Sequence, residues 1–176
     1  MSNQVLGLLL GSAVVAAVVS AAVGLITQYW AARLQIAARR RELYAKALEA
    51  CVAYRELPYA IRRRRHDQPE EERIRLSEIL RAVQQQLAFY TAWIESESPE
   101  VAASYRVLIQ ATRRLAGSQM HAAWEAAAPR SDAQMNVAGI DYSELVSLET
   151  SYLTSVRDHL APWWTRLWRF VASQAS

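Results

Sequence analysis

Residues 76–94, LSEILRAVQQQLAFYTAWI, carry the clearest heptad pattern of the chain. Apolar residues recur in this segment at alternating steps of four and three, and they are Leu76, Leu80, Val83, Leu87, Tyr90 and Ile94. Such spacing aligns side chains along one face of an α-helix, so the segment predicts an amphipathic helix that packs against other helices as in a coiled coil. The pattern indicates an all-α protein.

Helix boundaries flank this segment on both sides. Pro69 is followed by three glutamates, which is typical of a helix start, because proline suits the first turn and carboxylates suit the positive end of the helix dipole. Ser98 and Pro99 combine an N-cap residue with proline at the first helical position. They predict a second helix, whose apolar residues are Val101, Tyr105, Leu108, Leu115 and Trp124.

Two further patterns predict one helix before this pair and one after it. The first has its apolar face at Ile36, Leu43, Ala47, Ala50, Tyr54, Leu57 and Ile61, and Pro58 is expected to kink or stop it. After an aperiodic loop at 129–139, Asp141 and Glu144 resemble a capping box, and a helix with Leu145, Leu148, Tyr152 and Val156 runs until Pro162. Four helices with mostly short connections predict an antiparallel bundle.

Aromatic residues at helical spacing are expected to fill the core of this bundle. These residues are Tyr44, Tyr54, Tyr59, Tyr90, Trp93, Tyr105, Trp124 and Tyr152.

The chain before the bundle is apolar and carries no charge from Val5 to Ala32. At about 1.5 Å per residue, this length spans a hydrocarbon core of about 30 Å. We predict a transmembrane helix at 5–30, preceded by a short non-cytoplasmic segment at 1–4 and followed by a cytoplasmic bundle at 31–161. The competing interpretation is a cleaved signal peptide with small residues at Ser20, Ala21 and Ala22. Two features favour the anchor, namely the lack of a basic segment before the apolar run and the length of that run.

Charge asymmetry predicts the orientation of the span. No basic residue precedes it, whereas Arg33, Arg39, Arg40 and Arg41 follow it, and the side richer in Lys and Arg is normally cytoplasmic. Tyr29 and Trp30 lie where an interfacial aromatic belt belongs. We therefore expect a single-pass protein of the cell membrane, with its N-terminus outside and with Tyr29 to Arg41 at the cytoplasmic interface.

Small residues form a stripe along the predicted span. They recur at about every fourth position, at Gly7, Gly11, Ser12, Ala16, Ser20 and Gly24. Such a stripe lets two helix backbones approach closely in lipid, and it predicts self-association. The alternative is that Ala, Gly and Ser are simply frequent in this segment.

The C-terminal segment 162–176 combines tryptophan with arginine. Its aromatic and basic residues are Trp163, Trp164, Arg166, Trp168 and Arg169. In an antiparallel bundle the fourth helix returns toward the membrane, so this segment is expected to form a short amphipathic helix in the headgroup region. Alternatively, the tryptophans close the end of the bundle.

The run Arg62, Arg63, Arg64 and Arg65 is the most conspicuous charge feature. A continuous helix would place it roughly 40 Å from Arg33, beyond the reach of anionic headgroups. One interpretation is a site for a phosphate-bearing ligand, nucleic acid or an acidic partner. The other is a solvated helix end that faces Glu70 to Glu72 across the turn.

Enzyme and metal chemistry have little support in the sequence. His121 and Glu125 are four residues apart but have no second ligand pair, and neither a nucleophile motif nor a phosphate-binding Gly-rich loop occurs. The net charge of +3 does not indicate nucleic acid, and no cofactor or metal is expected. The single cysteine, Cys51, excludes an internal disulfide.

The sequence therefore predicts a non-enzymatic, membrane-anchored helical protein. We expect it to act as an oligomeric scaffold or interaction module that engages a protein partner at the cytoplasmic face. The alternative is a membrane-perturbing effector or channel-like oligomer, triggered by a ligand or partner at the bundle.

Overall fold

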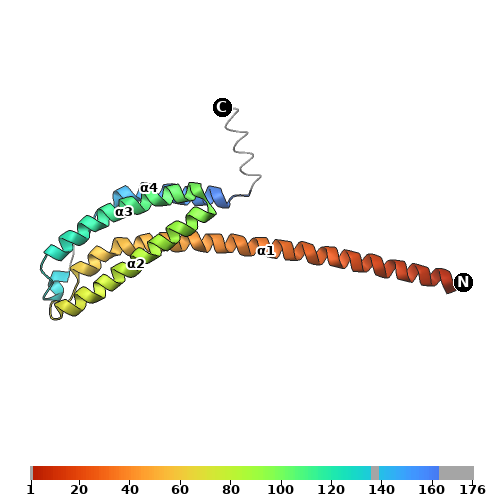
Figure 1. Ribbon diagram of the computed structural model, residues 1–176, viewed down its shortest axis with the longest axis horizontal. Coiled ribbons are helices and arrows are strands. Elements are labelled where there is room, and N and C mark those ends of the chain that lie inside the picture. Colours follow the sequence, from red (N-terminus) through yellow and green to blue (C-terminus); the bar gives the residue numbers. More distant parts are fainter. Residues whose placement is uncertain (1, 136–138, 163–176) are drawn as a thin grey trace, which may run out of the picture. The chain divides into compact units, whose positions relative to one another are not determined.

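The secondary structure of the described part of the chain is helical, with turns and loops between the helices. The computed structural model describes residues 2–135 and 139–162, with side chains from residue 20 onward except that of residue 132. Its helices are α1 (Ser2–Arg62), α2 (Pro69–Glu97), α3 (Pro99–Glu125) and α4 (Ser143–Leu160), and the short 3₁₀ helix η1 (Asp132–Met135) lies between α3 and α4 (Figure 1). The predicted all-α fold is confirmed.

The chain divides into two compact units, Met1–Arg41 and Glu42–Ser176. In its described part, the first unit is the N-terminal portion of α1. Ile36 was predicted to belong to the buried face, but this prediction is wrong, since its side chain is 51% exposed. Continuous burial begins at Leu43, because the helices that cover α1 belong to the second unit.

The described residues contain no helix that is both long enough and apolar enough to cross a membrane. The predicted span begins at residue 5, and the side chains of residues 1–19 lie outside the described part of the structure. The predicted interfacial tail at 163–176 lies outside it as well.

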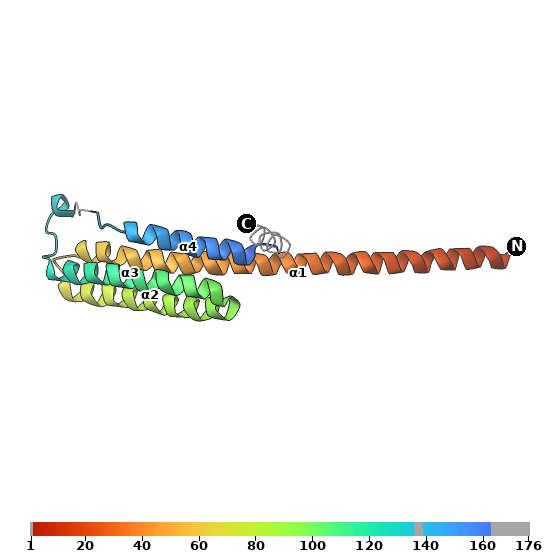
Figure 2. The same ribbon diagram turned by 90° about the horizontal axis from the view of Figure 1, so that it is seen from above.

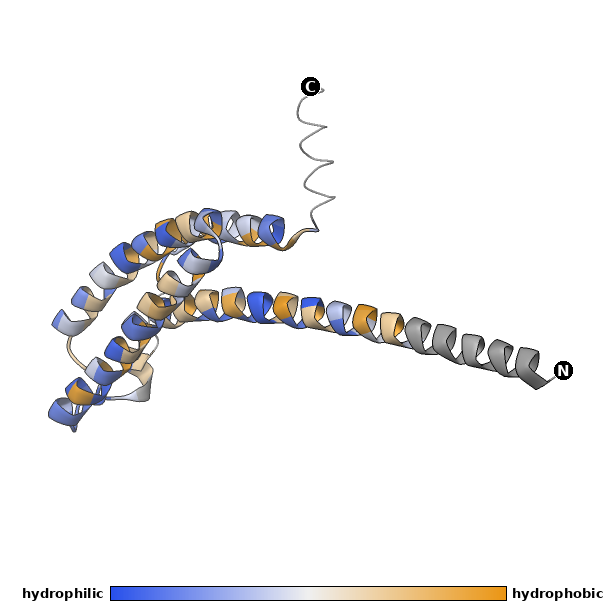
Figure 3. Ribbon diagram, turned by 45° about the vertical axis from the view of Figure 1, so that its right-hand side comes forward, coloured by the Kyte–Doolittle hydropathy of each residue, from blue (hydrophilic) through white to orange (hydrophobic). Residues whose placement is uncertain are grey.

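The second unit is an antiparallel bundle of four helices, formed by residues 42–62 of α1 together with α2, α3 and α4 (Figure 2). Hydrophobic and hydrophilic residues alternate along the ribbons (Figure 3), and buried hydrophobic residues from all four helices form the core. The predicted faces supply the core, which includes Leu43, Ala47, Tyr54, Leu57, Leu76, Leu87, Ile94, Val101, Tyr105, Leu108 and Tyr152.

Two buried tyrosines tie the bundle to α1. The hydroxyl of Tyr105 in α3 donates to the carbonyl of Ala47, and that of Tyr152 in α4 donates to the carbonyl of Tyr44, both at 2.8 Å. Their rings lie 5.3 Å apart. Burial raises the pKa of both phenols, so both hydroxyls keep the protons that these bonds require.

The helix ends follow the sequence signals closely, with two differences. Pro69 and Pro99 begin α2 and α3, and Ser98 caps α3, as predicted. Pro58 does not stop α1, which continues to Arg62, because a proline near a helix end removes only one backbone hydrogen bond. The capping box expected for α4 does not form, since Tyr142 is the N-cap residue and Asp141 instead accepts a hydrogen bond from the Ser143 amide.

Aromatic burial is the point at which the core prediction is least accurate. Tyr44, Tyr54, Tyr105 and Tyr152 are buried as predicted, and Tyr59 and Tyr90 are half-buried. Trp93 and Trp124 are exposed, so their placement in the core is wrong. Both lie beside the apolar stripe of their helix rather than on it.

Candidate functional site

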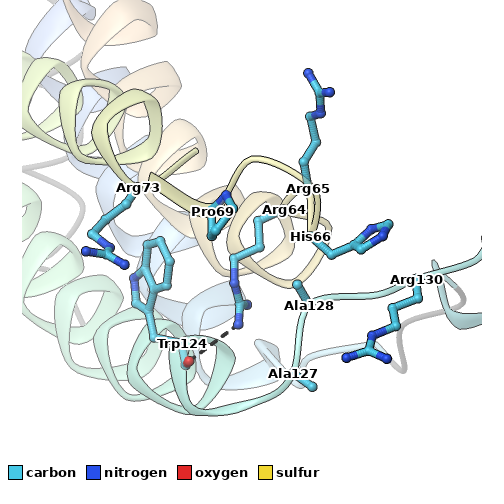
Figure 4. Close-up of a pocket in the computed structure, with 9 residues that line it drawn as sticks. All are labelled: Arg64, Arg65, His66, Pro69, Arg73, Trp124, Ala127, Ala128 and Arg130. Carbon is cyan, nitrogen blue, oxygen red and sulfur yellow. Dashed lines mark hydrogen bonds between the residues drawn. The ribbon is translucent and has the colours of Figure 1, made fainter. Parts of the chain in front are cut away.

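A pocket of about 540 Å³ lies at the end of the bundle where α1 and α3 finish and α2 begins. We call it the arginine pocket, and its lining residues are Arg64, Arg65, His66, Pro69, Arg73, Trp124, Ala127, Ala128 and Arg130 (Figure 4). The turn after α1, the first turns of α2, the end of α3 and the following loop all contribute. Four arginines from three separate segments thus line one pocket.

Arg64 holds this end of the bundle together. Its guanidinium donates to the carbonyls of Ile61 at 3.1 Å and Ala123 at 2.7 Å, and it also reaches those of Trp124 and Ala126 (Figure 4). It lies 5.2 Å from the centre of the Trp124 ring. Because the last carbonyls of a helix lack partners within the helix, a cation at this position caps α3 and joins it to α1.

The other three arginines of the run have separate contacts. Arg62 donates to the side chain of Gln119 in α3 at 2.7 Å, and Arg63 lies 6.0 Å from the centre of the Tyr59 ring. Arg65 forms a two-bond ion pair with Asp67 at 3.1 and 2.8 Å, and it points away from Arg64 (Figure 4). The run therefore does not act as one patch, and most of its charge is engaged within the protein.

Two arginines outside the run make the pocket cationic. In the described ranges, the guanidinium groups of Arg73 in α2 and Arg130 in the loop have no hydrogen bond or ion pair, and neither has the exposed imidazole of His66. The lining contains no carboxylate. These groups are therefore available to a ligand from solvent.

Two carboxylates near the pocket, those of Asp67 and Glu72, are bonded to arginines other than Arg73 and Arg130. Hydrogen bonds from Arg65 lower the pKa of the Asp67 carboxyl, and those from Arg75 lower the pKa of the Glu72 carboxyl. Glu72 is buried and meets Arg75 through two bonds of 2.9 and 2.8 Å. The backbone amide and the charge of Arg65 also lower the pKa of Glu72, so this glutamate lies near the arginine run as the sequence indicated. Neither of these two carboxylates pairs with Arg73 or Arg130.

Sequence reasoning missed Arg73, Arg130, His66 and Trp124 as members of this site. His66 and Arg73 follow the arginine run within eleven residues, but Arg130 is 65 positions beyond Arg65. Only the return of α3 to the end of α1 brings these segments together. The available signal was the aperiodic loop after α3, because ligand-binding residues often lie in such loops.

The predicted membrane-interface residues that the structure describes lie on α1. Tyr29 and Trp30 are exposed and meet edge to face at 6.3 Å, and Arg33 lies 5.0 Å from the centre of the Tyr29 ring. Arg39 and Arg41 are exposed and Arg40 is half-buried. The predicted residues Trp163, Trp164, Arg166, Trp168 and Arg169 lie outside the described residues.

The predicted self-association stripe is described only at its end. Ser20 is exposed, and a Cβ atom added to Gly24 would meet no other atom within 4 Å. Gly24 therefore has no packing role within the chain itself. The side chains of residues 7, 11, 12 and 16 lie outside the described part.

Other chemistry has little support in the described residues. They contain no group of three His, Cys, Asp or Glu side chains that could hold a metal ion. His121 and Glu125 form an exposed pair at 3.3 Å. Burial raises the pKa of the Cys51 thiol to about 11, which keeps the thiol protonated and unreactive at neutral pH.

Comparison with known proteins identifies no relative. No family model matches the chain, and no significant similarity links it to a curated protein or to a solved structure.

Proposed function

We propose that this chain is a membrane-anchored, non-enzymatic module that binds a phosphate-bearing ligand in the arginine pocket. The observation that carries the proposal is the pocket's charge: Arg64, Arg65, Arg73, Arg130 and His66 line it, and no carboxylate does. A concave site of about 540 Å³ has the size of a typical small-molecule pocket.

The chemistry of the lining favours phosphate. A guanidinium presents a planar fork of donors that matches two oxygens of a phosphate group, and charge-assisted bonds of this kind are stronger than neutral ones. Arg73 and Arg130 come from different segments, so together they can contact two sides of one anion. Arg64 is already bound to backbone carbonyls and contributes its charge rather than free donors.

The anchor is the second part of the proposal. The uncharged run from Val5 to Ala32 and the arginines after it support a span at 5–30 with the bundle in the cytoplasm. Self-association through the stripe from Gly7 to Gly24 is supported by the open space at Gly24. In this arrangement the module presents a bound ligand, or a partner that carries one, at the cytoplasmic face.

The test is ligand-induced stabilisation of the full-length protein in detergent. Tripolyphosphate serves as the soluble probe at constant ionic strength, and the melting temperature is measured as the probe concentration rises. Because a ligand that binds only the folded state adds stability by mass action, saturation at about 100 times Kd is expected to contribute about 2.7 kcal/mol. Substituting both Arg73→Gln and Arg130→Gln is expected to abolish the shift.

The matched control is Arg81→Gln, which removes an exposed arginine of α2 outside the pocket. It should retain the shift. A parallel arm replaces tripolyphosphate with phosphatidylcholine vesicles, with and without phosphatidylserine, to separate a soluble ligand from a headgroup. Equal shifts for the double variant and the control would overturn the proposal.

A further inference from the structure

Helix α2 carries a second heptad stripe that the bundle does not cover. We call it the outer stripe, and its residues are Ile79, Ala82, Gln86, Phe89 and Trp93, spaced at alternating steps of three and four. All five side chains are exposed, with Phe89 at 58% and Trp93 at 44%. Their two rings pack against each other at 5.5 Å, so they form one ridge rather than two isolated side chains.

The outer stripe is separate from the core face of the same helix. At 3.6 residues per turn, its centre is turned by roughly 100° from the line through Leu76, Val83, Leu87 and Ile94. A bundle helix of a monomer needs only one apolar face. The second one exposes aromatic surface to water, which usually marks an interaction site.

The charge pattern indicates what covers this stripe. No residue from Ala82 to Ile94 is charged, whereas the exposed face of α3 carries Arg106, Arg113 and Arg114. A charged partner could form no ion pair along this part of α2, because it carries no charged residue. A second copy of the same stripe meets it without repulsion between like charges.

We infer that the outer stripe of α2 binds the outer stripe of a second copy of this chain. Three properties point to a copy rather than another protein. A heptad stripe packs well against another heptad helix, which a second copy supplies, and the uncharged surface is compatible with itself. Gln86, in the middle of the stripe, has an amide that both donates and accepts, so two copies can pair across a two-fold axis.

This inference is independent of the arginine pocket, which lies at the N-terminal end of α2. It also differs from self-association of the span, because it places the contact on the bundle. The experiment must therefore report contact at a named position on α2 rather than only the mass of the assembly.

Disulfide cross-linking of the full-length protein in its membrane tests whether two copies touch at a chosen position on α2. Near a two-fold axis the Cβ atoms of Gln86→Cys come close enough to form a bond between copies. The matched control is Gln84→Cys, which replaces another exposed glutamine on the opposite side of α2. The native Cys51 is buried and should add little background. A cross-linked dimer is expected for Gln86→Cys, at a several-fold higher yield than for Gln84→Cys.

A second substitution tests the stripe itself. Adding Phe89→Glu to Gln86→Cys should remove the cross-link, because it brings like charges into the contact. Adding Ile74→Glu should not, since Ile74 is an exposed residue of α2 outside the stripe. Equal yields at positions 84 and 86, no dimer, a cross-link to a different protein, or a cross-link that survives Phe89→Glu would each overturn the inference.

Discussion

The arginines of this protein have either a structural role or a free guanidinium group, depending on the contacts that the fold gives each of them. Arg64 and Arg65 are neighbours in sequence, yet one holds backbone carbonyls at the end of α3 and the other pairs with Asp67. Arg73 has no partner among the described side chains and lines the same pocket. Residue type alone predicted a cationic region, and only the neighbours divide it into structural and available charges.

Replacing Arg64 with lysine tests the structural role. We expect Arg64→Lys to lower the free energy of unfolding by about 2 kcal/mol, because an ammonium group cannot satisfy several carbonyls at once and charge-assisted hydrogen bonds are lost. Urea unfolding measures the change. Arg63→Lys, which alters an exposed arginine beside Tyr59, is the control and should have little effect. An equal loss for both variants would contradict the capping role of Arg64.

At the scale of helices, apolar periodicity and the residues typical of helix ends predicted most helices and their buried faces. The heptad of residues 76–94 predicted the buried positions Leu76, Val83, Leu87 and Ile94, since a regular helix carries its spacing into three dimensions. Exposure of Trp93 could not be predicted in this way, because an aromatic side chain beside the core stripe fits either packing or solvent. Whether Trp93 is buried depends on which neighbouring helices cover that side of α2.

The acidic first turn of α2 makes a prediction about pH. Bonds from Arg75 hold the pKa of Glu72 below its ordinary value of 4.5, so the folded chain binds fewer protons there than the unfolded chain. This stabilisation is present above that ordinary value and is lost as pH falls through the lowered one. We expect Glu72→Gln to reduce the loss of stability between neutral pH and about pH 3, measured by urea unfolding.

The control for this prediction is Glu78→Gln. Glu78 is exposed on the same helix and makes no ion pair among the described residues. The two variants should therefore differ, and an identical pH profile for both would show that the Glu72–Arg75 pair does not contribute to acid unfolding.

At the scale of the whole molecule, the sequence predicted the number and direction of the bundle helices but not the pocket between their ends. Short connections favour antiparallel neighbours, so the pairing of α2 with α1 and of α3 with α2 followed from the chain itself. The pocket requires Arg130 and Arg73 to line the same space, and no local rule brings a loop residue to a particular helix end. Such long-range contacts depend on helix lengths and crossing angles together.

Orientation of the proposed anchor can be measured by thiol labelling in intact cells. We expect Asn3→Cys to react with a membrane-impermeant maleimide from outside, because residues 1–4 are proposed to lie beyond the outer face of the membrane. Gln84→Cys on the bundle should react only after permeabilisation. Reaction of Gln84→Cys in intact cells would exclude a cytoplasmic bundle, and loss of the introduced residue 3 from the mature chain would indicate cleavage.

The junction at Ser98 has a consequence for how this protein tolerates added sequence. One buried residue ends α2 and begins α3, with its amide bonded to Ile94 and its hydroxyl accepting from Val101. An insertion there would rotate one helix against the other by about 100° per residue and misalign both apolar faces. The connection from 126 to 142 is longer, and Gly139 in it is exposed with open space around it. A reporter domain or epitope tag therefore belongs beside Gly139, and the corner at Ser98 should be left untouched.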